Sequence, residues 1–150
     1  MAEPQPCLGV VVITHGVVGQ ALVAVADHIL AGRLRQVRVV TIPFLDGGAR
    51  EGEKPWQERR QGIEAEVATA VHAVDQGPGI LVLTDILGGT AFTVARQLTA
   101  GRQAALVAGV NLPMLLKLPS LMTLPVAEAA AALTERSRRA IDLFVQPRQG

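Results

Sequence analysis

Short apolar segments and longer segments of mixed polarity follow one another along this chain. Four short runs are rich in Val, Ile or Leu and show no polar alternation: Leu8–Ile13, Val37–Ile42, Ile80–Leu83 and Ala104–Val107. Runs of this kind are typical of strands that are covered on both faces. Longer segments of helical period lie between them, so the pattern predicts a parallel sheet with crossover helices.

The segments predicted to be helices are Gly19–Ala31, Glu53–Asp75, Thr90–Leu98 and Pro125–Phe144. The first ends at a glycine cap, Gly32, and has one apolar face. That face consists of Leu22, Val25, Ala26, Ile29 and Leu30. The last is rich in alanine and is expected to become extended near its end. The stretch Asp46–Pro55 is rich in glycine and charge, which predicts a surface loop.

Together these elements predict one domain over residues 1–150, of α/β class. We expect three layers, αβα, around a mostly parallel sheet of strand order 2-1-3-4, the usual outcome of right-handed crossovers with one reversal. In open sheets of this kind, ligands bind outside the carboxyl ends of the strands, near the point of reversal. Strands one and three would be neighbours there.

Composition and charge narrow the class of protein further. Apolar residues make up 49% of the chain, and the formal net charge is +1, which favours neither nucleic acid nor an anionic membrane as a partner. No apolar stretch reaches the roughly 18 residues of a membrane-spanning helix. The first residues lack the pattern of a signal peptide, and a lone cysteine, Cys7, fits a reducing compartment. We therefore expect a soluble, cytoplasmic protein.

Two strands end at residues that carry chemistry. His15 and Gly16 follow the first apolar run, and Asp85 follows the third. An imidazole attacks phosphorus through an unprotonated ring nitrogen, so its other nitrogen must hold the proton. A carboxylate that accepts this N–H fixes the tautomer and the orientation of the ring. The pair His15 and Asp85 therefore predicts a histidine that carries a phosphoryl group.

The residues after Asp85 suit the phosphoryl oxygens. Gly88, Gly89 and Thr90 open a predicted helix, and backbone N–H groups at such a start bind anions without a cation. Thr14, Gly16 and Asn111 lie at the same strand ends and are candidates for lining the site. Asn111 could equally be a turn residue that caps a helix.

The nature of the phosphoryl donor follows from what these loops lack. The three loops around His15, Asp85 and Asn111 contain no Lys or Arg, and the chain has no GxxxxGK[ST] phosphate loop. A nucleoside triphosphate is therefore not the expected donor. We expect a phosphorylated partner protein instead, with neither a cofactor nor a metal.

Three segments resemble the IIA domain of mannose-type sugar phosphotransferase systems (PTS). Val12-Ile13-Thr14-His15-Gly16 resembles the phosphohistidine segment of that family. The segment from Thr84 to Phe92 resembles its Asp-x-x-Gly-Gly-Ser-Pro-Phe segment, and the segment from Gly109 to Met114 matches Gly-Val-Asn-hydrophobic-Pro-Met. Their order and spacing also fit, and the likeness extends from about Leu8 to Val145.

The resemblance implies a cytoplasmic phosphotransferase, peripheral to a membrane permease at most. It would accept a phosphoryl group on His15 from the carrier protein HPr, which enzyme I charges from phosphoenolpyruvate, and pass it to a IIB component. Asp85 would be the hydrogen-bond partner of His15. Members of the family are homodimers that exchange a short C-terminal antiparallel strand, which here would fall near Ala140–Val145.

The chain departs from the family pattern in the turn after the two glycines. Thr90 replaces the usual Ser and keeps its hydroxyl group. Ala91 replaces Pro, and Thr93 replaces Asn. These replacements change the first turn of the predicted helix, where they bear on phosphate geometry and on the choice of partner more than on the identity of the histidine.

Two other enzyme classes need residues that the strand ends do not offer. A histidine phosphatase or mutase needs an arginine just before the histidine, where this chain has Thr14. A metal hydrolase needs more ligands at strand ends, and only Asp46 adds to the pair. A non-catalytic regulatory module, whose partner binding is switched by phosphorylation of His15, is the remaining alternative. Transfer to a IIB acceptor would distinguish it from a relay.

Overall fold

The computed structural model describes residues 6–34, 36–44 and 54–148. Its strands are β1 (Gly9–His15), β2 (Val37–Ile42), β3 (Ile80–Thr84) and β4 (Ala104–Ala108). Its α-helices are α1 (Val18–Ile29), α2 (Trp56–Val74), α3 (Thr90–Leu98), α4 (Leu112–Lys117) and α5 (Val126–Arg139), with a 3-10 turn, η1 (Leu118–Ser120), after α4. Most of the predicted loop Asp46–Pro55, including Asp46, lies outside the described residues.

The strands form one parallel sheet in the order β2-β1-β3-β4. This confirms the predicted order. In the register of the sheet, Ile13 of β1 lies beside Thr84 of β3, and His15 lies beside Ile42 of β2. The carboxyl ends of β1 and β3 are therefore neighbours, as the strand-end interpretation requires.

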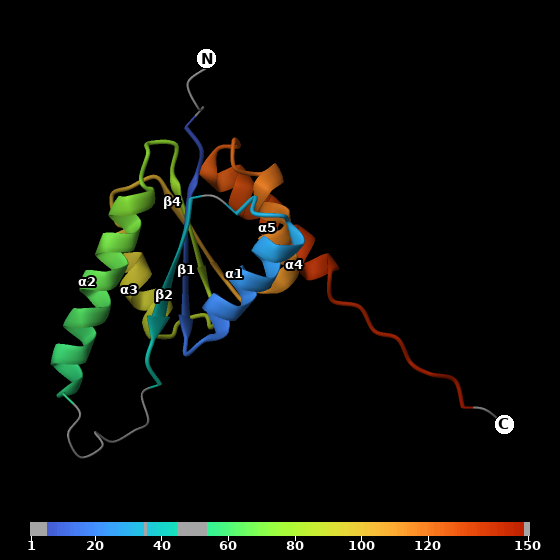
Figure 1. Ribbon diagram of the computed structural model, residues 1–150, viewed down its shortest axis with the longest axis horizontal. Helices are drawn as coiled ribbons and strands as arrows, with labels where there is room; N and C mark the ends of the chain where they lie inside the picture. The colour runs from blue at the N-terminus through green and yellow to red at the C-terminus, as the bar shows by residue number, and fades with distance from the viewer. Residues whose placement is uncertain (1–5, 35, 45–53, 149–150) are drawn as a thin grey trace.

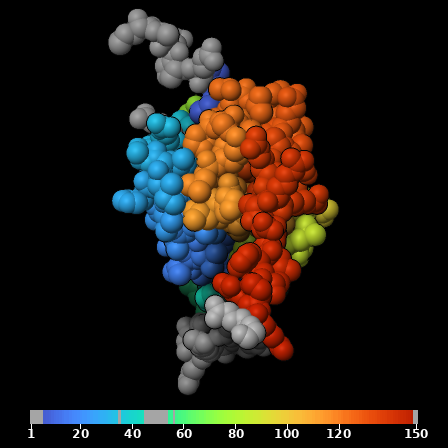
Figure 2. Space-filling view, turned by 90° about the vertical axis from the view of Figure 1, so that its right-hand side faces the viewer, coloured from blue at the N-terminus to red at the C-terminus, as the bar shows by residue number. Residues whose placement is uncertain are grey.

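Helices cover both faces of the sheet, which confirms the three-layer architecture. Figure 1 shows α2 and α3 on one face and α1, α4 and α5 on the other. Figure 2 shows α1, α4 and α5 side by side on the second face. Side chains of β1 alternate between the two layers: Val11 and Ile13 pack towards α2 and α3, and Val10 and Val12 towards the other helices. All four are fully buried, as the unbroken apolar run predicts.

Helices α1 and α2 begin and end within three residues of their predicted bounds, and two other helices depart further from the prediction. The short helix α4 was not predicted as an element, because six residues that include Pro113 show no helical repeat. Helix α5 ends at Arg139 and not at Phe144. Its last buried residue is Ser137, so beyond Arg139 no contact with the sheet remains to hold a helix. Residues 141–148 have no regular structure and extend away from the body of the molecule (Figure 1).

The apolar face of α1 is only partly covered in a single chain. Ala26 is fully buried, whereas Val25 and Ile29, which share its predicted face, are 48% and 55% exposed. The apolar stripe of α1 is thus wider than its contact with the sheet and α4. Among the described residues, no helix is both long enough and apolar enough to cross a membrane.

Candidate functional site

The site is built around two hydrogen bonds to a single carboxylate oxygen. His15 is the last residue of β1, and Asp85 directly follows β3. Oδ2 of Asp85 accepts the backbone N–H of His15 at 2.8 Å and lies 2.9 Å from Nδ1 of its ring. The other oxygen, Oδ1, accepts the backbone N–H of Ile86 at 2.9 Å. The two residues that the strand-end interpretation expected to meet are thus in direct contact.

This contact fixes which ring nitrogen of His15 can react. A carboxylate can only accept a hydrogen bond, so Nδ1 carries the proton and Nε2 keeps its lone pair. The side chains of His15 and Asp85 are 21% and 16% exposed, which leaves the ring within reach of a partner but largely shielded from water. Nε2 is therefore the ring nitrogen whose lone pair is available.

The charge of Asp85 is held by the same hydrogen bonds. Burial by itself would raise the pKa of this carboxyl group. The hydrogen bonds from the backbone and ring of His15, together with the one from the backbone of Ile86, outweigh burial and lower its pKa below the usual value. Asp85 is therefore a carboxylate at neutral pH and can serve as the acceptor for Nδ1–H.

The start of α3 lies against the imidazole. A Cβ built on Gly89 would be 3.8 Å from Cε1 of His15, the ring atom bonded to Nε2. Gly89 is the N-cap of α3 and offers no side-chain cap, and the preceding Gly88 has φ +76, a conformation that favours glycine. The first N–H groups of α3 are thus left without intrahelical partners, beside the imidazole of His15.

The other candidate residues surround this centre in different ways. The Thr14 side chain is fully buried, and its Oγ1 accepts the N–H of Gly19 at 2.7 Å, in the first turn of α1. Gly16 has φ +53, and the ring of Phe44 lies against its Cα, so that an added Cβ would be 2.6 Å from the ring. Asn111 caps α4, because its Oδ1 accepts the N–H of Met114 at 3.0 Å.

A cation that the motifs did not reveal lies beside the start of α3. Arg60 of α2 lines a cavity of about 170 Å³ together with Gly88, Gly89, Thr90, Thr93 and Val94. No local motif marks Arg60, which is far from the strand-end loops in the sequence. Helical spacing could have identified it, because Arg60 precedes the buried Ile63 and Val67 by one and two turns on the same face of α2.

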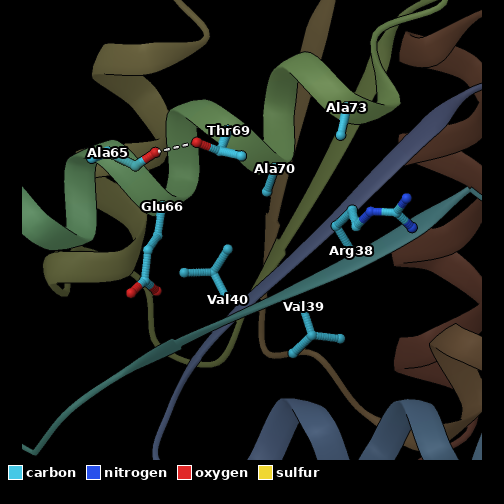
Figure 3. A pocket seen from close by; sticks show the side chains of 8 residues that line it. All are labelled: Arg38, Val39, Val40, Ala65, Glu66, Thr69, Ala70 and Ala73. Atoms are coloured by element: carbon cyan, nitrogen blue, oxygen red, sulfur yellow. Dashed lines mark hydrogen bonds between the residues drawn. The ribbon is translucent and has the colours of Figure 1, made fainter.

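A larger hollow lies away from this chemistry. It measures about 400 Å³ and lies between the edge strand β2 and α2 (Figure 3). Its lining residues are Arg38, Val39, Val40, Ala65, Glu66, Thr69, Ala70 and Ala73. None of the strand-end residues belongs to it, and the Thr69 hydroxyl is already used in a hydrogen bond to the carbonyl of Ala65. Within the described ranges, no group of three or more His, Cys, Asp or Glu side chains is placed to hold a metal.

Comparison with known proteins places the chain among phosphotransferase components. A family model, EIIA-man, described as PTS system fructose IIA component, matches residues 9–137. The structure is similar to the mannose/sorbose specific IIA subunit of the phosphotransferase system from Enterococcus faecalis, with 26% identity, a TM-score of 0.75, and 95% of this chain and 98% of that chain covered. No curated protein matches the sequence significantly.

Two further solved structures share the fold at lower identity. One is the PTS IIA protein associated with the fucose utilization operon from Streptococcus pneumoniae, at 21% identity and a TM-score of 0.67, covering 89% of this chain and 91% of that chain. The other is the phosphotransferase system component EIIA from Streptococcus agalactiae, at 23% identity and a TM-score of 0.67, covering 91% and 97%.

Proposed function

The chain belongs to the EIIA-man family of sugar phosphotransferase-system components, and on this premise we propose that it relays a phosphoryl group between proteins through His15. The observation that carries this proposal is the hydrogen bond between Asp85 Oδ2 and His15 Nδ1, at 2.9 Å. It leaves Nε2 as the reactive nitrogen, beside the uncapped start of α3.

In the proposed step, the lone pair of His15 Nε2 attacks the phosphorus of a donor phosphohistidine. A new N–P bond forms at Nε2 as the donor N–P bond breaks, and the donor nitrogen keeps the electron pair. Asp85 holds the Nδ1 proton throughout and stabilises the positive charge that develops on the ring. The N–H groups of Gly88, Gly89 and Thr90 receive the phosphoryl oxygens. Transfer to an acceptor is the reverse of this step.

The surface around His15 suits a protein as the donor. Val17, Phe44, Ile86 and Leu87 follow the ends of three strands and are 70%, 68%, 57% and 73% exposed. Exposed apolar side chains gathered around a reactive group are typical of a protein contact surface. We therefore take HPr as the donor and a IIB component as the acceptor, in the cytoplasm and without a cofactor.

A homodimer is part of the same proposal. Beyond α5, Ile141, Leu143, Phe144 and Val145 are all at least 71% exposed in the single chain. Val25 and Ile29 on α1 are exposed as well. A second copy would cover apolar surface of this kind, and a C-terminal segment that pairs with the partner's sheet would become the expected antiparallel strand.

The test is phosphorylation with purified enzyme I, HPr and phosphoenolpyruvate, followed by intact-mass measurement. We expect one acid-labile phosphoryl group on the wild type and none on His15→Ala. His28→Ala and His72→Ala are matched controls, because both of these side chains are exposed on helices and should leave labelling unchanged. Labelling of His15→Ala would contradict the proposal.

Addition of a IIB component then distinguishes a relay from a regulatory module. A relay loses its phosphoryl group to the acceptor within the time of the assay. A module whose binding is switched by phosphorylation keeps it.

A further inference from the structure

We propose that Arg60 binds the phosphoryl group carried by His15, as a cationic donor supplied by α2. This inference rests on the proposed relay and adds a residue that belongs to none of the strand-end segments. Arg60 and the Gly88–Thr90 segment line one cavity, and a Cβ added to Gly89 in that segment would lie 3.8 Å from Cε1 of His15. The segment that faces the imidazole is therefore the same segment that lines the cavity with Arg60.

The lining of this cavity suits a small anion. The residues that line it include Arg60, Thr90, Thr93 and two glycines, which carry N–H and hydroxyl donors. None of the described residues that line it is acidic. Its volume, about 170 Å³, is below the range of roughly 300 to 1,000 Å³ that is usual for drug-sized ligands. A phosphoryl or phosphate group matches both the size and the donor character.

Arg60 is held in place without being fully used. Its Nε donates to Glu64 Oε1 at 2.8 Å, and its Nη2 donates to Gln97 Oε1 of α3 at 3.3 Å. Within the part of the chain that the structure describes, Nη1 has no acceptor. The guanidinium side chain is 39% exposed and can turn towards a phosphoryl group while it keeps its bond to Glu64. Arginine offers several donors in one plane, which suits the oxygens of such a group.

The charge of a phosphohistidine makes this contact valuable. The phosphoryl group carries negative charge, and the strand-end loops themselves contain no Lys or Arg. Backbone N–H groups supply only partial positive charge. The Arg60 guanidinium is paired with Glu64, but it keeps N–H donors that can reach a phosphoryl group, so it stabilises the phosphorylated form relative to the free histidine.

The experiment measures the equilibrium of phosphoryl exchange between HPr and this chain. We expect Arg60→Gln to lower the fraction of phosphorylated chain, with an equilibrium constant reduced about ten-fold, as for the loss of one charged hydrogen bond. Arg60→Lys should recover part of the loss. Arg96→Gln, on the exposed last turn of α3, is the matched control and should match the wild type.

A second measurement does not depend on phosphoryl transfer. Inorganic phosphate is titrated into the unphosphorylated wild type while the NMR signals of the Gly89 and Thr90 amides and of Arg60 Nε are followed. We expect these three signals to shift together, and the amide shifts to weaken in Arg60→Gln. This arm reports free phosphate, and the exchange assay reports the group on His15.

The two measurements separate the possible failures. If the wild type is phosphorylated and Arg60→Gln has the same equilibrium constant, the role of Arg60 is refuted and the relay stands. If the wild type is not phosphorylated at all, the relay fails, and the phosphate titration alone decides on the anion site. Absence of a shift at Arg60 in that titration would then overturn this inference too.

Discussion

The starts of α1 and α3 lie at the same edge of the sheet but differ in how their N–H groups are used. At α1, the hydroxyl of Thr14 accepts the N–H of Gly19 within the protein, at 2.7 Å. At α3, the N-cap is Gly89, which has no side chain to offer. A helix start normally has its free donors satisfied by a cap, water or a ligand. The start of α3 is thus the one of the two that can receive an anion from outside.

The difference comes from adjacent residues of one strand. Thr14 and His15 point to opposite faces of the sheet, as successive strand residues do. Thr14 points towards α1 and stabilises the fold, and His15 points towards α3 and is left to react. One strand end therefore supplies both a cap and a nucleophile. Changes at either helix start should affect one property and spare the other.

Among variants that keep His15, the largest effect is expected from closing the start of α3 with Gly89→Asp. Gly89 has φ −72 and ψ 179, a conformation suited to a capping side chain, and the nearest atoms to an added Cβ are 3.8 Å away. The new carboxylate would occupy the free N–H groups and repel the phosphoryl group. We expect phosphorylation to fall about 1,000-fold, the equivalent of two charged hydrogen bonds.

Stability provides the control for this substitution. Thermal or urea unfolding of Gly89→Asp should change by only about 0.5 kcal/mol, since a helix start tolerates Gly and Asp nearly equally. Gly89→Ala adds a methyl group without a charge and should keep most of the activity. An Asp variant that is phosphorylated at the wild-type rate would show that the start of α3 does not bind the phosphoryl group.

A smaller effect is expected when His15 loses its partner in Asp85→Ala. The ring then lacks the acceptor that fixes its tautomer, and we expect the rate of phosphorylation to fall about 100-fold. The measurement is a time course of labelling by intact mass, with folding checked by circular dichroism. Normal labelling kinetics in this variant would rule out an orienting role for Asp85.

The same variant has a defined pH signature. Because folding lowers the pKa of Asp85, its charged form stabilises the folded state above the unfolded pKa of about 4, and this contribution is lost as the pH falls through the folded value. The difference in unfolding free energy between wild type and Asp85→Ala should therefore shrink in acid.

The smallest effect on activity is expected from opening the start of α1 with Thr14→Val. The variant keeps the shape of the side chain but leaves the buried N–H of Gly19 without its acceptor. We expect a loss of about 1 to 2 kcal/mol in the free energy of unfolding, measured in urea. Phosphorylation should be unchanged at temperatures where the protein is folded. A large loss of activity in the folded variant would mean that the two helix starts are coupled.

Hydrophobic periodicity predicted most of the fold. The rule that ligands bind at the carboxyl ends of parallel strands predicted the centre of the site. The apolar runs of the central strands β1 and β3 are buried on both faces, whereas the edge strands β2 and β4 are only partly buried, and the composition of all four identified them. Helix α3 has the predicted bounds, Thr90–Leu98. The meeting of His15 and Asp85 followed from the strand order, because residues at adjacent parallel strand ends are close in space.

What the sequence did not predict depends on contacts between distant segments. Arg60 joins the site only because α2 packs against α3, and no local pattern encodes that packing. The exposure of Val25 and Ile29 and the end of α5 at Arg139 depend on how far the sheet reaches beneath each helix. Apolar residues beyond that reach, such as Leu143, look like core residues in the sequence.

The two interactions of Asp85 Oδ2 with His15 also affect the kinetics of binding to a partner protein. One oxygen contacts both the backbone N–H and the ring of the same residue, so the side-chain torsions of His15 are restricted when the chain folds. The conformational entropy of the His15 side chain is thus already lost on folding, before a partner binds. When a partner docks, the imidazole already has its reactive orientation. Only the relative orientation of the two proteins remains to be reached.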